Sequence, residues 1–173
     1  MLRTRVGYAG GTTSSPTYQS IGDHSEALQI DFDPELISYE ELLAEFFSSH
    51  NPCRVAFSQQ YRSAIFPHGE AQARAAEEAS RRAAVERGSQ VVTDIEPFTG
   101  FTLAEDYHQK YRLRFDKALM AAFGEVYPTM EELLGSTAVT RANAFIAGHG
   151  DERLVAEDLP RMGLTPELQG RLR

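Results

Sequence analysis

Two short strand patterns joined by a long polar loop limit the fold of this chain more than any other feature. The first, Arg3–Gly7, alternates weakly and runs into the glycine-rich turn GYAGG. The second, Glu26–Phe32, alternates cleanly, which places Glu26 on the same face as three apolar residues. The segment between them, Thr12–Gly22, is rich in Thr, Ser, Pro and Gly and reads as a loop, while Pro34 stops the second strand. The pattern predicts a sheet near the N-terminus with a polar loop at one end.

Helix signals follow the second strand. Ser38 and Glu41 have the spacing of a capping box, which predicts a helix that starts after Ser38 and ends near His50. Residues Glu70–Arg87 are rich in Ala, Glu and Arg, and Gly88 is a natural helix end. The other expected elements before the tail are strands at Tyr61–Phe66 and Val91–Ile95 and helices at Leu103–Phe115 and Lys117–Phe123.

The tail changes character after about residue 130, where short helical segments alternate with Gly and Pro. These segments are Glu131–Leu134, Ala138–Ala147, Glu152–Asp158 and Thr165–Leu172. The predicted fold class is α+β, with a two-layer mixed β-sheet covered by helices and a short helical C-terminal appendage. The predicted domains are an α+β domain over residues 1–130 and a helical extension over residues 131–173.

Composition excludes several classes of partner. The chain has 173 residues, a formal net charge of −8 and 42% hydrophobic residues. The negative charge disfavours nucleic acid and anionic membranes as partners. The absence of an apolar run long enough for a membrane span, or of a signal-peptide core, predicts a soluble cytoplasmic protein. The single cysteine, Cys53, cannot form an intrachain disulfide, so nothing ties the fold to an oxidising compartment.

Three oxygen-bearing residues are the candidates for chemistry. Glu26 is the best of them, because a carboxyl group that faces apolar surroundings is protonated more readily and suits a proton donor. Tyr18 follows Pro16 in the polar loop, and Tyr61 follows a polar run, so both phenols could donate hydrogen bonds into one pocket. The alternatives are a solvent-exposed or arginine-paired glutamate and two ordinary aromatic residues, since the chain holds seven tyrosines.

Cys53 is a further candidate, as a reactive thiol. It follows Asn51 and Pro52 and precedes Arg54, and an adjacent cation lowers the pKa of a thiol. The alternative is an inert cysteine. The five histidines lack metal-ligand spacing, and the GYAGG turn lacks the Lys and Ser or Thr of a phosphate loop. The sequence therefore predicts neither a metal nor an organic cofactor.

Several segments together resemble the A-type peptide methionine sulfoxide reductases (MsrA). They are RTRVGYAGG, PTY, GDHSEALQIDFDPELISYEELL, FFSSHNP, QYRSAIF and FTLAEDYHQKY, in the family's order, and they cover Leu2 to Leu113. The resemblance implies a ferredoxin-like MsrA-type core. It also implies a peptide-methionine (S)-S-oxide reductase, an oxidoreductase that repairs proteins after oxidative stress.

The resemblance also assigns roles to residues. In the family a cysteine thiolate attacks the sulfur of methionine-S-sulfoxide, free or in proteins. A glutamate then protonates the sulfoxide oxygen, which two tyrosines hold. By motif these residues are Glu26, Tyr18 of PTY and Tyr61 of QYRSAIF. The resulting sulfenic acid is resolved by a second thiol or directly, with thioredoxin or another dithiol as the reductant.

The chain departs from the family pattern at the nucleophile. It has no Gly-Cys-Phe-Trp motif, no Trp, no carboxylate in residues 54–60 and no C-terminal resolving cysteines. Since the family motif lies upstream of these residues, we expect the gene product to start before Met1 and to carry the nucleophilic Cys there. The alternatives are a non-catalytic module that binds a sulfoxide or a protein, or a reductase that relies on Cys53.

Overall fold

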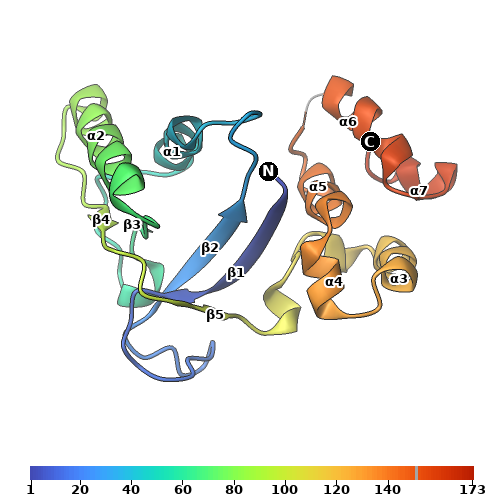
Figure 1. Cartoon of the computed structure of the whole chain (residues 1–173), viewed down its shortest axis with the longest axis horizontal. Coiled ribbons are helices and arrows are strands. Elements are labelled where there is room, and N and C mark those ends of the chain that lie inside the picture. The colour runs from blue at the N-terminus through green and yellow to red at the C-terminus, as the bar shows by residue number, and fades with distance from the viewer. Residues whose placement is uncertain (151) are drawn as a thin grey trace. The chain divides into compact units, whose positions relative to one another are not determined.

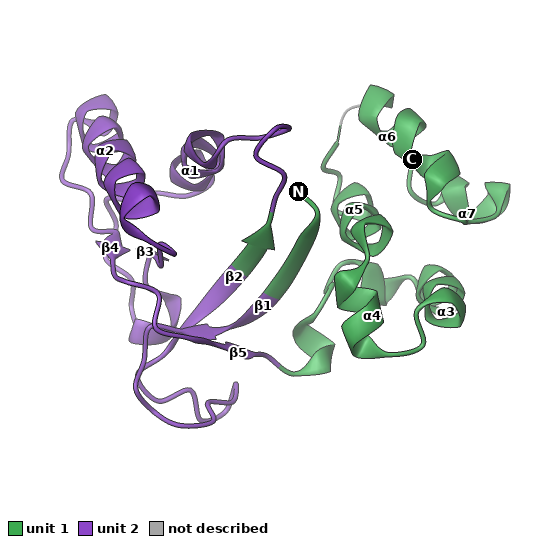
Figure 2. Ribbon diagram, in the orientation of Figure 1, with its two compact units in different colours: residues 1–5, 29–31, 105–173 green, residues 6–28, 32–104 purple. Residues whose placement is uncertain are grey.

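The protein is described here by a computed structural model, which covers residues 1–150 and 152–173. It contains two compact units (Figure 2). Unit 1 comprises residues 1–5, 29–31 and 105–173, and unit 2 comprises residues 6–28 and 32–104. Helices and strands both occur, so the predicted α+β class is confirmed. The predicted domain boundary at residue 130 stays a prediction.

The structure contains a three-stranded sheet (Figure 1). Its strands are β1 (Arg3–Ala9), β2 (Ser25–Asp31) and β5 (Phe101–Leu103), in the order β2-β1-β5. β1 and β5 pair antiparallel, with Gly7 opposite Leu103. A Cβ atom at Gly7 would overlap the backbone oxygen of Thr102, so this close pairing requires glycine. β2 is an edge strand, and it carries Glu26.

Unit 2 holds the first of two hydrophobic cores. Helix α1 (Tyr39–Ser48) begins with the predicted capping box, and helix α2 (Glu70–Arg87) ends at Gly88, whose φ of 59° is left-handed. A second sheet pairs β3 (Ala64–Ile65) with β4 (Asp94–Ile95) in parallel, so the strands form two sheets where one mixed sheet was expected. The core consists of Leu43, Phe47, Ile65, Ala76, Ala79 and Ala83.

One expected helix does not form, and two expected strands are shorter than predicted. The helix expected at Leu103–Phe115 does not form, because residues 101–103 pair with β1 and two short 3₁₀ turns follow, η2 (Asp106–His108) and η3 (Leu113–Phe115). Between these turns Lys110 has a φ of +51°, which interrupts any helix. The strands expected at Tyr61–Phe66 and Val91–Ile95 shrink to the two-residue strands β3 and β4.

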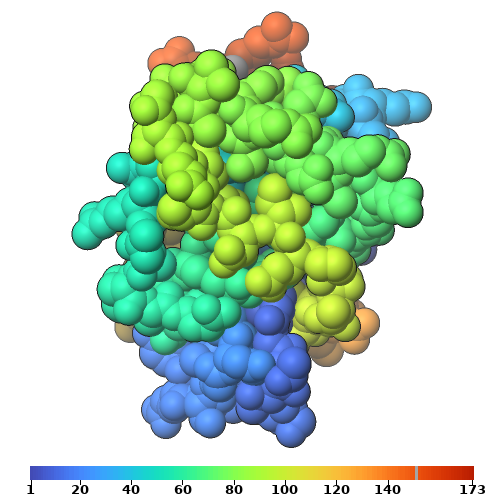
Figure 3. All heavy atoms as spheres, turned by 90° about the vertical axis from the view of Figure 1, so that its left-hand side faces the viewer, coloured from blue at the N-terminus to red at the C-terminus, as the bar shows by residue number. Residues whose placement is uncertain are grey.

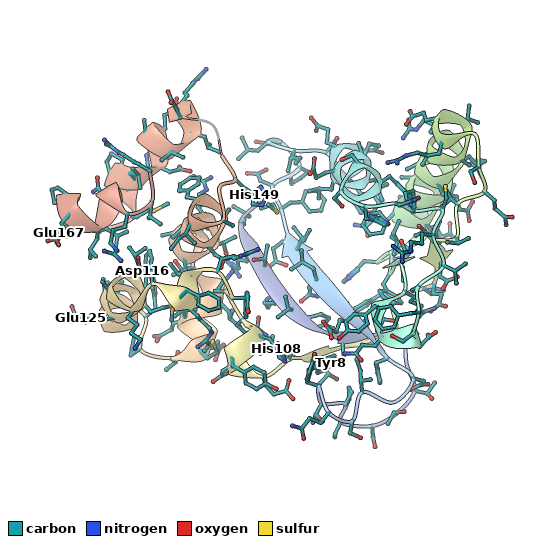
Figure 4. The ribbon with its side chains drawn as sticks, turned by 180° about the vertical axis from the view of Figure 1, so that it is seen from behind. Tyr8, His108, Asp116, Glu125, His149 and Glu167 are labelled. Atoms are coloured by element: carbon teal, nitrogen blue, oxygen red, sulfur yellow. The ribbon has the colours of Figure 1, made fainter. Side chains whose placement is uncertain are left out.

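Unit 1 holds the second hydrophobic core, formed by short helices. They are α3 (Lys117–Val126), α4 (Met130–Gly135), α5 (Thr137–Ile146), α6 (Glu152–Asp158) and α7 (Pro166–Gly170), with the 3₁₀ turn η4 (Leu159–Arg161) after α6. Asp116, at the start of α3 (Figure 4), accepts from the backbone N–H groups of Ala118 and Leu119, and from Arg171 Nε at 2.6 Å. These bonds tie the C-terminal residues to α3. Within residues 1–150 and 152–173, no helix is both long and apolar enough to cross a membrane.

Lys110 is a buried cation in unit 1. Its Nζ atom donates to the carbonyl and hydroxyl oxygens of Thr4, at 3.0 and 2.9 Å, and to Thr140 Oγ1 at 2.7 Å. These three acceptors are uncharged oxygens and do not offset the cost of burying the charge. Burial, together with the nearby positive charge of Arg5, lowers the pKa of Lys110 to about 8.

The depressed pKa of Lys110 predicts a stability that depends on pH. Since the folded protein binds fewer protons than the unfolded chain between the two pKa values, its free energy of unfolding rises with pH in that range. We expect the wild type to gain about 2 kcal/mol relative to Lys110→Met between about pH 8 and about pH 10. Urea unfolding of both proteins across this range measures the difference, and parallel pH profiles would contradict the expectation.

Candidate active site

The three residues proposed from the sequence come together in unit 2. The hydroxyl oxygens of Tyr18 and Tyr61 lie 3.4 Å apart, although 43 positions separate the two residues. Gln60 Nε2 donates to Glu26 Oε1 at 2.6 Å and to Tyr61 Oη at 3.1 Å. Figure 3 shows the polar loop (blue) beside the segment that contains Tyr61 (teal). We call Tyr18, Glu26, Gln60 and Tyr61 the oxygen cluster.

The loop that carries Tyr18 is held by two neighbouring side chains. The carboxylate of Asp23 accepts from the backbone N–H and the hydroxyl group of both Thr12 and Thr13, at 2.7–2.9 Å. These bonds hold the pKa of Asp23 well below its usual range. The buried His24 donates from Nε2 to the Thr13 carbonyl oxygen at 2.8 Å, while Nδ1 accepts a backbone N–H from the glycine turn at 3.2 Å. The loop is therefore fixed at its base.

Arg62 fixes the turn that carries Tyr61. Its Nε donates to Ser25 Oγ at 2.8 Å, and that hydroxyl donates to the carbonyl oxygen of Gln59 at 2.9 Å. The guanidinium also makes two hydrogen bonds to Glu96, at 2.5 and 2.8 Å, which lower the pKa of that carboxyl. Ser25 begins β2, so these bonds attach the Tyr61 turn to the strand that carries the catalytic candidate glutamate.

The expected burial of Glu26 is wrong. Glu26 is exposed, and Tyr18 and Tyr61 are 40% and 44% exposed. The physical reason is the position of β2 at the edge of its sheet, where Leu28, the next residue on the same face, is also 56% exposed. The alternation in the sequence was therefore a poor guide to burial. In this chain the oxygen cluster is open to solvent.

The electrostatics of the cluster keep Tyr61 protonated. The hydrogen bond with Tyr18, followed by partial burial and the negative charge of Glu26, raises the pKa of Tyr61 to about 12. A protonated phenol is a hydrogen-bond donor at neutral pH. Two phenol hydroxyl groups and a carboxyl group at one place can hold a polar, uncharged oxygen and supply it with a proton.

Sequence reasoning missed Gln60, which bridges Glu26 and Tyr61. The polar run SQQY marked this turn, but nothing in the run distinguishes Gln60 from its neighbour Gln59. Only the placement of the turn against β2 shows that the Gln60 amide reaches both partners.

Cys53, the reactive thiol considered from the sequence, is not one of the four residues of the oxygen cluster. Cys53 is half-buried, and its Sγ lies 3.9 Å from the carbonyl oxygen of Ser89, just after α2. None of the contacts described for Cys53 joins it to the oxygen cluster, and a reactive role for this thiol stays a prediction. Across the described residues, no group of three or more His, Cys, Asp or Glu side chains is placed to hold a metal ion.

Comparison with known proteins identifies the family. The family model for peptide methionine sulfoxide reductase matches residues 1–129. Peptide methionine sulfoxide reductase A5 of Oryza sativa subsp. japonica is 40% identical over 154 residues, which are 85% of this chain and 59% of the rice protein. Peptide methionine sulfoxide reductase of Drosophila melanogaster is 38% identical over 168 residues, 96% of this chain and 67% of the fly protein. The chain thus spans about three fifths of the rice relative.

Solved structures agree with the sequence comparison. Reduced Mxr1 from Saccharomyces cerevisiae superposes with a TM-score of 0.61 at 30% identity, over 65% of this chain and 70% of the yeast chain. Methionine sulfoxide reductase A of Corynebacterium diphtheriae has a TM-score of 0.55 at 30% identity, over 65% of this chain and 63% of its own. The match in sequence and in fold shows that this chain belongs to the peptide methionine sulfoxide reductase family.

Proposed function

We propose that this protein reduces methionine-S-sulfoxide to methionine and that the oxygen cluster binds and protonates the sulfoxide oxygen. The observation that carries the proposal is the meeting of the Tyr18 and Tyr61 hydroxyl groups, 3.4 Å apart, beside the Glu26 carboxyl group. A sulfoxide oxygen is an uncharged acceptor with a partial negative charge. Placed between the two phenols, it would replace their mutual contact with two hydrogen bonds.

In the proposed reaction a thiol attacks the substrate sulfur and the sulfur–oxygen bond of the sulfoxide breaks. The oxygen ends on the thiol sulfur as a sulfenic acid, so the thiol sulfur is oxidised and the substrate sulfur is reduced to a thioether. Glu26 takes up the proton that the thiol loses as it becomes the attacking thiolate, and donates this proton to the oxygen as its charge develops. A dithiol such as thioredoxin then reduces the sulfenic acid, releasing water and a disulfide.

We also propose domain boundaries, a range of substrates and a cellular location. The family match ends at residue 129, which supports a reductase domain over residues 1–130 and a helical extension over residues 131–173. Both free and protein-bound methionine-S-sulfoxide are proposed as substrates. A cytoplasmic location is proposed because a reducing compartment keeps thiols and dithiol reductants in their active form.

Stereospecific turnover tests the proposed function. The product of the gene, translated from the furthest upstream in-frame start codon, is assayed with the separate S and R epimers of methionine sulfoxide and with dithiothreitol. We expect reduction of the S epimer and none of the R epimer. A Cys53→Ser variant of the same product should retain this activity if Cys53 is a bystander, and lose it if Cys53 is the nucleophile. Failure to reduce either epimer would overturn the proposal.

A further inference from the structure

An exposed apolar pair precedes the second phenol of the oxygen cluster. Val55 is 75% exposed and Phe57 is 87% exposed, in the loop that leads to the Tyr61 turn. The ring of Phe57 lies against that of Tyr61, with a centroid separation of 5.2 Å and an angle of 40° between the planes. Since Tyr61 also touches Tyr18, the apolar surface of Phe57 continues directly into the oxygen cluster.

The ring of Phe57 is exposed in the free protein, so a ligand that buries it would gain favourable binding free energy. Burial of a phenylalanine ring is strongly favourable, and Phe57 keeps almost all of its apolar area in contact with water. The ring also has an aromatic neighbour that limits its freedom, so its immobilisation by a ligand costs less entropy. An apolar ligand group that contacts Phe57 would remove most of this apolar area from water, and this burial would favour binding.

We propose that Phe57 is a specificity-determining residue that contacts an apolar side chain next to the oxidised methionine of a peptide substrate. The inference rests on the proposed function, because Tyr61 is assigned there to the sulfoxide oxygen. Neighbouring residues of an extended peptide are about 3.3–3.6 Å apart along the chain. The 5.2 Å between the Phe57 and Tyr61 rings therefore matches a position one or two residues from the methionine sulfoxide.

The oxygen cluster and Phe57 would recognise different parts of a peptide substrate. The hydroxyl and carboxyl groups of the oxygen cluster recognise the S=O group, which every methionine sulfoxide shares. Phe57 recognises a group that free methionine sulfoxide lacks. Peptides in which a Leu or another apolar residue flanks the oxidised methionine should therefore bind more tightly than peptides with flanking glycines.

Titration of the 173-residue chain with two capped tripeptide amides tests the inference. The peptides contain methionine-S-sulfoxide between two leucines or between two glycines, and Kd is measured by NMR or calorimetry. We expect the wild type to bind the leucine peptide about tenfold more tightly. Phe57→Ala should reduce this ratio to near one, while Phe57→Leu should retain part of it.

A matched control comes from unit 1. Phe115 is 71% exposed and its ring lies 5.0 Å from that of Tyr111, so Phe115→Ala removes an equivalent exposed ring and should leave the ratio unchanged. Tyr61→Phe should weaken binding of both peptides by a similar factor. The unoxidised leucine peptide should bind much more weakly than its sulfoxide.

The outcomes separate the two proposals. Equal Kd values for both sulfoxide peptides, unchanged in Phe57→Ala, would overturn the inference and leave the oxygen cluster intact. Equal affinity for the oxidised and unoxidised leucine peptides would also overturn it, because Phe57 would then bind apolar groups without regard to the sulfoxide. If the chain binds neither sulfoxide peptide, the proposed oxygen site fails and the inference fails with it.

Discussion

Glu26→Gln is expected to lower kcat/KM for methionine-S-sulfoxide by about 10²–10³-fold, within the range typical of losing a general acid. The amide has the size of the carboxyl group and can still accept the hydrogen bond from Gln60, which the structure places 2.6 Å from Glu26 Oε1. It cannot give a proton to the sulfoxide oxygen. The loss corresponds to about 3–4 kcal/mol of transition-state stabilisation. Steady-state assays of the gene product with the S epimer and a dithiol measure it.

The same substitution at an unrelated glutamate provides the control. Glu125 is exposed in α3, and Figure 4 shows it in the helical unit. Glu125→Gln should keep wild-type kcat/KM. A Glu26→Gln enzyme within about twofold of the wild type would remove Glu26 from the proton-transfer step. A circular dichroism spectrum and a urea unfolding midpoint equal to those of the wild type would show that the fold of this variant is intact.

Phe123→Ala is expected to lower the free energy of unfolding by about 3–5 kcal/mol, the usual cost of removing a buried phenylalanine ring. Phe123 is 1% exposed, in the core that the helices of unit 1 share, and its ring stacks on that of Tyr127 at 6.4 Å. The same core contains residues from both sides of position 130, including Leu119 and Leu133. Urea unfolding followed by circular dichroism measures the change.

Val126→Ala is the control for this experiment. Val126 is 60% exposed at the end of the same helix, so its truncation should change the free energy of unfolding by no more than about 0.5 kcal/mol. A loss below about 1 kcal/mol in Phe123→Ala would mean that the helical core is not packed around this ring.

Elements defined by local signals were predictable from the sequence. The Ser38 and Glu41 capping box and the glycine at position 88 fix the start of α1 and the end of α2, because these bonds join residues a few positions apart. β5 was not predictable in this way. Its residues pair with β1, for example Leu103 with Gly7. The local sequence of a short strand does not indicate which distant segment it pairs with.

The members of the candidate site were predictable, but their environment was not. Tyr18, Glu26 and Tyr61 follow from residue types and from motifs that resemble a family. Their exposure depends on β2 lying at the edge of the sheet, and an alternating pattern looks the same in an edge strand and a central one. The role of Gln60 depends on a contact across 34 positions of sequence.

A crystal structure of the 173-residue chain with methionine-S-sulfoxide bound would show whether the two phenols of the oxygen cluster hold the sulfoxide oxygen. We expect the sulfoxide oxygen to lie about 2.6–3.0 Å from both the Tyr18 and Tyr61 hydroxyl oxygens, with the Glu26 carboxyl group within reach of it. A sulfoxide bound elsewhere, or one whose oxygen touches neither phenol, would contradict the proposed oxygen site.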